Sequence, residues 1–239
     1  MEKNFAFFEK RRLVEVMPAE WRDKVATLLV PIRHAEYTAN LNNCYMSAYG
    51  YGTAITQACL YAGLDHLGIA QYLTRIGLAV GDGDTAVLDA AKVAWIGDET
   101  WQPLRKLCED LLVTKDWFEL FVAQNLVLDG LLYPLAYDRF DRVISRHGGS
   151  ALAMLTDFAL EWFGESSRWV DATLKTAAAE SDQNKAQIEQ WANAWSTRVI
   201  EALTPIAVAE FGAEGEATLA EIRAELVTRA KKKSGLDLQ

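Results

Sequence analysis

The pattern of apolar and polar residues predicts long helices, and the clearest of them runs from Asp116 to about His147. Its apolar positions recur at steps of three and four and form one stripe, made of Trp117, Phe121, Leu128, Leu131 and Leu135. The apolar surface is widened to the side by Phe118, Val122, Leu132 and Phe140. A helix that is apolar on so many faces lies either at the centre of a large core or against another subunit.

Two details of this segment favour a helix over a strand. Polar residues fall inside the apolar run at Gln124, Asn125 and Asp129, and they would not alternate cleanly at a strand's period of two. Pro134 follows Gly130 by four positions, so the carbonyl that the proline ring would crowd belongs to a residue without a side chain. We therefore expect the helix to bend at Gly130 and to continue through Pro134.

The same periodicity predicts further helices at about 19–48, 53–78, 86–95, 151–180, 181–211 and 217–231. Another helix, capped by Asp98 or Thr100, leads into the central stretch. Pro31 is expected to kink the first of them. Together with 116–147, the long helices 19–48, 53–78 and 151–180 form two hairpins joined by a crossover, which is the connectivity of a ferritin-like bundle. The predicted fold is all-α, with a ferritin-like (ribonucleotide-reductase-like) four-helix core and additional flanking helices.

We expect residues 1–239 to form a single domain, because the length and the 51% hydrophobic content suffice for one sizeable core. Residues 1–17 are amphipathic and too short to be stable alone, so they need a surface to lie on. The C-terminal helices within residues 182–239 are expected to pack on the bundle.

Composition and charge exclude several classes of partner. The formal net charge of −9 disfavours nucleic acid and anionic membranes, since both require a positive face. No uninterrupted apolar run reaches the roughly twenty residues of a membrane span, and the N-terminus lacks a signal-peptide pattern. Three widely spaced cysteines (Cys44, Cys59 and Cys108) indicate buried reduced thiols, so we expect a cytoplasmic protein.

The three histidines do not have the spacing of a dinuclear metal site. A di-iron bundle takes a glutamate from each of two helices and Glu-x-x-His from each of the other two. The residues three positions before His34, His66 and His147 are Pro31, Gly63 and Ile144. His34 and Glu36 are two positions apart, and Asp65 and His66 are neighbours, so each pair diverges on a helix. We predict a bundle with no metal site.

No other catalytic motif stands out. The Gly81–Asp84 turn resembles a calcium loop but lacks its glycine and its fifth-position ligand. Glu161 and Glu165 lie one turn apart next to Arg168, which is typical of a solvated ion-pair face. A Ser/His/Asp or Cys/His site assembled in space stays open, although nothing in the sequence favours it.

A four-helix core without metal ligands, with excess apolar surface, suggests a subunit of a larger assembly. We expect the partner to contact the helix that begins at Pro18, the 53–78 helix and the outer side of the 116–147 helix. Polar residues in apolar surroundings would be costly in a sealed core without hydrogen-bond partners. The predicted interface residues are Arg33, His34, Glu36, Asn40, Asn42, Asn43, Asp65 and Gln71.

Several long segments resemble one known family. They are Phe8–Arg11, PIRHAEYTANLNN at 31–43, DHLGIAQYLTRIGL at 65–78, WQPLRKLCEDLLVTKDWFELFVAQNLVLDGLLYPLAYD at 101–138 and MLTDFALEWFGESSRWVDATLKTAAAES at 154–181. The chain resembles the β (small) subunit of the hydroxylase in bacterial multicomponent soluble di-iron monooxygenases, of the phenol hydroxylase and propane monooxygenase type. The family usually has a substantial N-terminal arm before the segment at Phe8, so residues 1–17 correspond to a remnant of that arm.

The resemblance implies a ferritin-like subunit with no cofactor of its own. It implies an α subunit that carries the di-iron centre, a γ subunit in an (αβγ)2 hydroxylase, a reductase with FAD and a 2Fe–2S cluster, and a small coupling protein. The expected reaction is hydroxylation of phenol-like aromatics or of short alkanes such as propane, with O2 and electrons from NADH. Two alternatives remain, namely a self-sufficient carboxylate-bridged oxidase and a helical scaffold protein unrelated to oxygenation.

Overall fold

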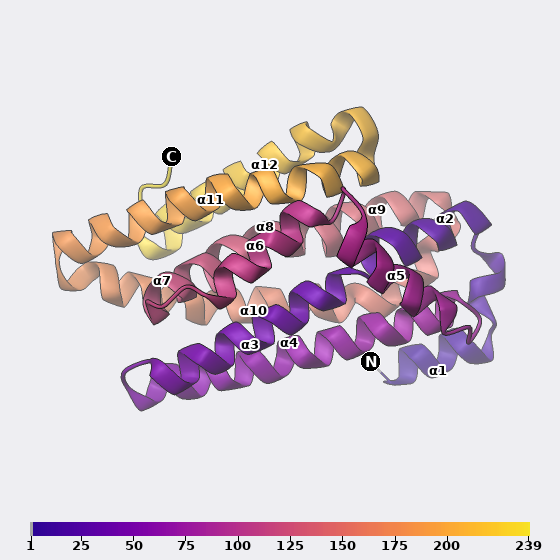
Figure 1. Ribbon diagram of the computed structural model, residues 1–239, viewed down its shortest axis with the longest axis horizontal. Coiled ribbons are helices and arrows are strands. Elements are labelled where there is room, and N and C mark those ends of the chain that lie inside the picture. The colour runs from indigo at the N-terminus through magenta and orange to yellow at the C-terminus, as the bar shows by residue number, and fades with distance from the viewer. Residues whose placement is uncertain (1) are drawn as a thin grey trace.

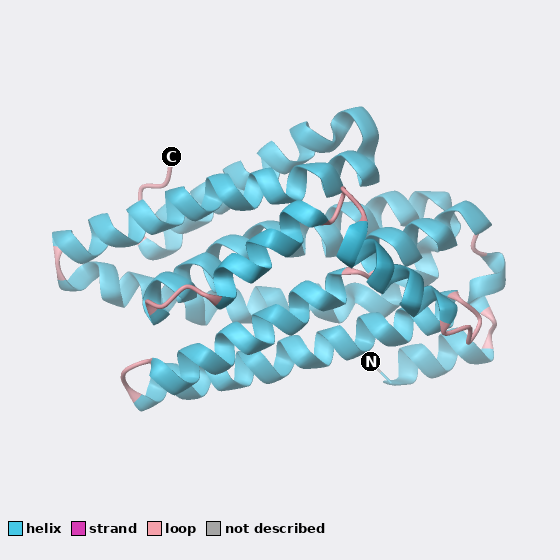
Figure 2. Ribbon diagram, viewed as in Figure 1, coloured by secondary structure: helices cyan, strands magenta, loops and turns pink. Residues whose placement is uncertain are grey.

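The computed structural model describes residues 2–239, which form helices joined by short turns (Figure 1). No strand occurs in this part of the chain, as the secondary-structure colouring of Figure 2 shows. The α-helices are α1 (Glu2–Lys10), α2 (Ala19–Lys24), α3 (Ile32–Tyr49), α4 (Thr53–Val80), α5 (Ala86–Gly97), α6 (Gln102–Leu112), α7 (Trp117–Phe121), α8 (Asp129–Tyr133), α9 (Phe140–Ile144), α10 (Ser150–Glu180), α11 (Asp182–Phe211) and α12 (Gly215–Arg229). The all-α prediction is confirmed.

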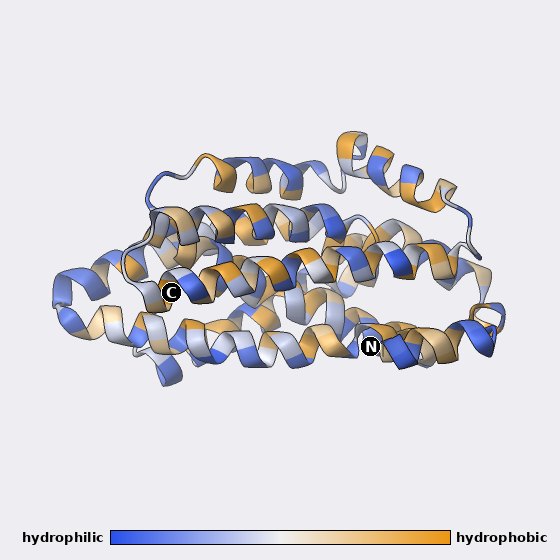
Figure 3. Cartoon of the chain, turned by 90° about the horizontal axis from the view of Figure 1, so that it is seen from below, coloured by the Kyte–Doolittle hydropathy of each residue, from blue (hydrophilic) through white to orange (hydrophobic). Residues whose placement is uncertain are grey.

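Two helical hairpins make the core, as the sequence predicts. Helices α3 and α4 pack along their length, and α10 lies against α8, α9 and α4. The hairpin of α3 and α4 is tight because Gly63 has no side chain, and a Cβ there would lie 3.3 Å from the backbone oxygen of Asn40. In Figure 3, hydrophobic and hydrophilic residues alternate along the helices in view.

The central helix, Trp117–His147, contains α7, α8 and α9 and runs through the middle of the molecule. Every residue from Leu120 to Tyr133 is buried. Helix α11 packs on its first half and α12 on α8 and the turn that follows (Figure 1). The expectation that a partner covers its outer side is therefore wrong, because the chain's own C-terminal helices do so.

By length and composition this central helix could also cross a membrane, but 94% of its most apolar window is buried inside the protein. It has the surroundings of a core helix.

Pro134 lies inside the central helix, as predicted. The chain takes a π-type turn over Pro134–Arg139 and then resumes as α9. A π turn has i→i+5 hydrogen bonds and is the usual way in which a helix absorbs a local mismatch. The missing N–H of Pro134 is thus accommodated without a break in the helix.

Replacing Gly130 with leucine should destabilise the protein by about 1–3 kcal/mol, the usual cost of overpacking a full core. A Cβ at Gly130 would lie 2.9 Å from Cδ1 of Leu226 on α12. Gly130→Ala is the matched variant, and it should cost less because only the flexible end of Leu226 must move. Urea denaturation of both variants tests this, and equal losses would contradict the steric argument.

The first long helix differs from its predicted 19–48 span. Helix α2 continues through a π turn at Val25–Leu29 and then stops, and α3 starts anew at Ile32 after a turn at Val30 and Pro31. Val30 and Pro31 both keep right-handed helical dihedral angles, so the chain stays helical in conformation there. The interruption of hydrogen bonding at Pro31, which has no N–H to donate, is consistent with the expected kink.

The N-terminal segment packs through Phe5 and Phe8, both buried.

The three cysteines are free thiols, of which Cys59 and Cys108 are buried. Burial raises the pKa of each of these two thiols to about 12, so both stay protonated.

Candidate functional site

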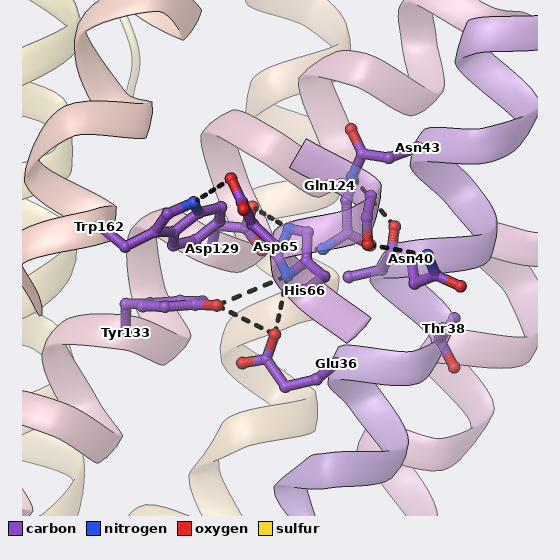
Figure 4. Close-up of polar contacts among 12 residues, drawn as sticks. Glu36, Thr38, Asn40, Asn43, Asp65, His66, Gln124, Asp129, Tyr133 and Trp162 are labelled. Carbon is purple, nitrogen blue, oxygen red and sulfur yellow. Dashed lines mark hydrogen bonds and ion pairs between the residues drawn. The ribbon is translucent and has the colours of Figure 1, made fainter. Parts of the chain in front are cut away.

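A buried cluster of polar side chains lies at the centre of the bundle (Figure 4). Glu36 comes from α3, His66 from α4, and Asp129 and Tyr133 from α8, while Tyr137 follows one turn later on the central helix. None of the five is more than 4% exposed. We call these five residues the Glu36 cluster.

The Glu36 carboxylate accepts three hydrogen bonds. Nδ1 of His66 lies 2.7 Å from its Oε2, and the Tyr133 hydroxyl donates to the same oxygen at 2.9 Å. The Tyr137 hydroxyl donates to Oε1 at 3.2 Å. Three donors on two oxygens describe an ionised carboxylate whose hydrogen-bonding capacity is met inside the protein.

Asp129 holds the opposite side of the imidazole. Its Oδ2 is 3.4 Å from Nε2 of His66, which is ion-pair distance, although the two atoms are not aligned as a hydrogen bond. Its Oδ1 accepts a hydrogen bond from Gln124 at 2.8 Å, and Asn42 donates to the amide oxygen of Gln124 at 2.9 Å. The network thus links α3 and α4 to the central helix.

The electrostatics favour a charged His66. Burial lowers the pKa of His66, but Asp129 and Glu36 outweigh it and raise the pKa to about 10. The pKa of Glu36 lies above its ordinary value, because burial raises it by more than the hydrogen bond and charge of His66 lower it. The pKa values of Tyr133 and Tyr137 are raised by burial and by Glu36, so both phenols keep their protons. We conclude that His66 is an imidazolium that pairs with two carboxylates.

The pKa of His66 predicts how stability depends on pH. Its folded value of about 10 exceeds the ordinary value of 6.5, so its contribution to stability is full below about pH 6.5 and is lost as the pH rises towards 10. We expect the difference in free energy of unfolding between the wild-type chain and His66→Gln to shrink from pH 6.5 to pH 10. Urea denaturation across this range measures it, and a difference that grows with pH would contradict the assignment.

These residues do not fit a dinuclear iron centre. Glu36 and Asp129 could serve as the two single carboxylates, but α4 has Gly63 where Glu-x-x-His requires a glutamate before His66. Helix α10 presents Trp162, whose ring centroid is 4.8 Å from that of His66. Within residues 2–239, no three His, Cys, Asp or Glu side chains are arranged to hold a metal ion. A self-sufficient oxidase would need donors that these positions do not supply.

Three of the predicted interface residues are internal. Glu36, Asn42 and Asn43 are at most 1% exposed. Each has a hydrogen-bond partner on the central helix, and Glu36 also pairs with His66 of α4. Asn43 exchanges hydrogen bonds with Asn125 at 3.1 and 3.2 Å. Asn40, at 7% exposed, donates to the backbone oxygen of Gly63 at 2.7 Å. These polar residues join the helices of the bundle to one another.

The other four predicted interface residues reach the surface. Arg33, His34 and Gln71 line a groove of about 190 Å³ between α3 and α4. Burial, with the positive charges of Arg33 and Lys92, lowers the pKa of His34 to about 4, so His34 is neutral. Asp65 is exposed and accepts a hydrogen bond from Nε1 of Trp162 at 2.9 Å. Their contact with another subunit remains a prediction.

An exposed apolar face lies on the same hairpin. It comprises Tyr37 and Leu41 of α3, with 52% and 38% exposed, and Leu60 and Leu64 of α4, with 42% and 54% exposed. The residues recur at steps of four on both helices, so they line up along the two packed helices. We call these four residues the α3–α4 face. Exposed apolar patches rimmed by polar groups are typical of protein interfaces.

Sequence reasoning missed the Glu36 cluster as a unit. In the sequence Asp129 stands out only as a polar residue inside an apolar run, and nothing distinguishes Tyr133 and Tyr137 from other apolar-face residues. The available signal was their spacing, because residues 129, 133 and 137 follow one another at steps of four and share a helix face.

Comparison with known proteins agrees with this architecture. Residues 1–181 match the methane/phenol/alkene hydroxylase family. The chain is 48% identical over 231 residues to the phenol 2-monooxygenase oxygenase component DmpL of Pseudomonas sp. (strain CF600), covering 97% of this chain and 69% of the relative. It is 46% identical, with the same coverage, to the oxygenase component MhpL of Acinetobacter pittii (strain PHEA-2).

Two solved structures share the fold. Xenon-pressurised phenol hydroxylase from Pseudomonas sp. OX1 superposes with a TM-score of 0.94 at 42% identity, covering all of this chain and 71% of the other. Toluene 4-monooxygenase superposes with a TM-score of 0.78 at 23% identity, covering 92% and 70%, which indicates the fold alone. The resemblance seen in the sequence is confirmed, and the alternative of a scaffold unrelated to oxygenation is set aside. This chain belongs to the methane/phenol/alkene hydroxylase family.

Proposed function

We propose that this chain is the non-catalytic β subunit of a di-iron hydroxylase that acts on phenol-like aromatics. Its iron-bearing α partner carries out the oxygenation with O2 and with electrons that originate from NADH. The names of DmpL and MhpL, both oxygenase components of phenol 2-monooxygenase, favour phenol over short alkanes such as propane. The observation that carries the proposal is the position of His66, which lies 2.7 Å from Glu36 and 3.4 Å from Asp129 at the centre of a bundle with the dinuclear topology.

In this proposal the chain contributes a rigid surface. The Glu36 cluster links α3, α4 and the central helix by charge-assisted hydrogen bonds, which are stronger than neutral ones. The α3–α4 face, rimmed by Arg33, His34, Asp65 and Gln71, docks on the α subunit. An obligate contact of this kind buries on the order of 2,000 Å² or more.

The assembly we propose is (αβγ)2, served by a coupling protein and by a reductase with FAD and a 2Fe–2S cluster, in the cytoplasm. Co-expression with candidate α and γ subunits tests it. The chain expressed alone is expected to aggregate or self-associate, and a co-expressed α subunit should keep it soluble and restore phenol hydroxylation. A monomeric chain with oxygenase activity of its own would overturn the proposal.

Iron should be found in the complex that contains the α subunit and not in the isolated chain. The isolated chain is expected to bind no stoichiometric iron, because Gly63 and Trp162 occupy positions where a dinuclear site needs donors. Metal analysis of the refolded chain and of the complex measures this. About two irons per isolated chain, lost on Glu36→Ala, would show that the donor argument fails.

A further inference from the structure

Aromatic side chains lie next to one another at the Glu36 cluster, where Figure 4 shows Trp162 beside Tyr133. The rings of Tyr137 and Tyr133 have centroids 5.0 Å apart, and those of Tyr133 and Trp162 are 5.2 Å apart. Trp162 is partly exposed, and its Nε1 donates to the exposed Asp65. Tyr133 is fully buried, so Trp162 is the side chain through which this path of rings reaches solvent.

Tyrosine and tryptophan are the side chains that lose one electron most readily, and rings in contact can pass that electron. An oxidised phenol is strongly acidic, so it needs a base within hydrogen-bond reach to take its proton. The Tyr133 hydroxyl has such a base, since it lies 2.9 Å from Oε2 of Glu36. Tyr137 lies beyond Tyr133 on this path, and its hydroxyl is the more distant of the two, at 3.2 Å from Oε1.

The charge of the cluster favours oxidation at this position. With His66 charged and Glu36 and Asp129 ionised, the cluster carries a net charge of −1. Loss of one electron from Tyr133, with transfer of its proton to Glu36, leaves a neutral radical, a neutral Glu36 and the His66–Asp129 pair. The net charge of the buried cluster is then zero. Oxidation is favoured because it removes an uncompensated charge that is costly away from water.

We propose that Trp162, Tyr133 and Glu36 form a proton-coupled one-electron relay. An oxidant at the surface takes one electron from Trp162. Tyr133 then donates one electron to the oxidised Trp162. The phenolic proton of Tyr133 moves to Oε2 of Glu36, so the oxidant is reduced by one electron and Tyr133 remains as a neutral phenoxyl radical. That the physiological oxidant is a strongly oxidising product of O2 activation in the partner subunit rests on the proposed function, whereas the relay itself does not.

Photo-oxidation of the full-length chain tests the relay without any partner. Ruthenium(III) tris(bipyridine), generated by a laser flash with an added electron acceptor, serves as the oxidant, and electron paramagnetic resonance on frozen samples detects the radical. The wild-type chain should give a long-lived tyrosyl signal, because the radical is buried. Tyr133→Phe should lose this signal, and Trp162→Phe should greatly reduce its yield.

Two variants serve as controls for the position of the radical. Tyr137→Phe removes the other phenol on the same carboxylate, and Tyr61→Phe removes a tyrosine that is 65% exposed. Both should keep the long-lived signal. Circular dichroism and thermal melting establish that each variant is folded. Glu36→Gln removes the base and turns one of its two acceptor oxygens into a donor NH2 group, so it should shorten the lifetime of the radical.

The relay is overturned if folded Tyr133→Phe keeps the long-lived signal, or if Trp162→Phe leaves its yield unchanged. A different observation would contradict the proposed function, namely that the chain does not bind the α subunit. The photo-oxidation result does not depend on that binding, so the two outcomes are separable.

Discussion

Replacing His66 with alanine is expected to lower the free energy of unfolding by about 3–5 kcal/mol, the usual cost of removing one partner from a buried ion pair. The variant leaves Glu36 and Asp129 in the interior without the cation that lies 2.7 Å from one and 3.4 Å from the other. It also leaves a cavity among four helices, which adds to the loss. Urea denaturation at pH 7 measures the change.

The matched control is His147→Ala, because His147 is exposed and lies outside the Glu36 cluster. It should cost far less than His66→Ala. The deficit of His66→Ala should also shrink at low pH, since two buried carboxylates without a cation are relieved of charge when they take up protons. A deficit no larger than that of His147→Ala would show that the imidazolium is not what balances Glu36 and Asp129.

The fold was accessible from the sequence because its main signals are local. The apolar stripe of the central helix, the glycine four positions before Pro134 and the turns between helices each lie within one segment. Which helices pack against each other depends on residues that are far apart in the sequence, so local patterns do not predict it. The apolar excess of the central helix suggested a second subunit, and the structure instead places α11 and α12 there.

The Glu36 cluster was missed for the same reason. Sequence reasoning compared His34 with Glu36 and Asp65 with His66, pairs that share a helix and diverge on it. The pair that forms is Glu36 with His66, on two different helices, and its geometry depends on the register between α3 and α4. The close crossing at Gly63 allows this approach of the two helices.

A polar residue in apolar surroundings can either bind another helix of the same bundle or face a partner protein. Only its hydrogen-bond partners in the structure distinguish the two cases. Asn42 and Asn43 were grouped with Arg33 and Gln71 because all four stand in apolar surroundings. The first two are satisfied by Gln124 and Asn125 inside the bundle, whereas the last two line an open groove. The predicted partner surface therefore keeps only the residues on the exposed side of α3 and α4.

Replacing Leu64 with glutamate should abolish assembly with the α subunit. Leu64 is 54% exposed and lies within the α3–α4 face, so the variant chain itself is expected to fold. A carboxylate forced into an apolar interface without a partner costs several kcal/mol, and each 1.4 kcal/mol weakens binding about tenfold. Val208→Glu is the matched control, because Val208 is 43% exposed on α11, which lies on the opposite side of the molecule (Figure 1).

The measurement is the amount of each variant that co-purifies with a tagged α subunit, together with phenol hydroxylation per milligram and per intact complex. Leu64→Glu should lose co-purification and activity together, while activity per intact complex stays constant, because the role proposed for the α3–α4 face is to bind the partner and not to take part in the chemistry. Val208→Glu should behave like the wild type. If Leu64→Glu assembles normally, the α subunit binds elsewhere; if it assembles and loses activity per complex, the face contributes to the reaction itself.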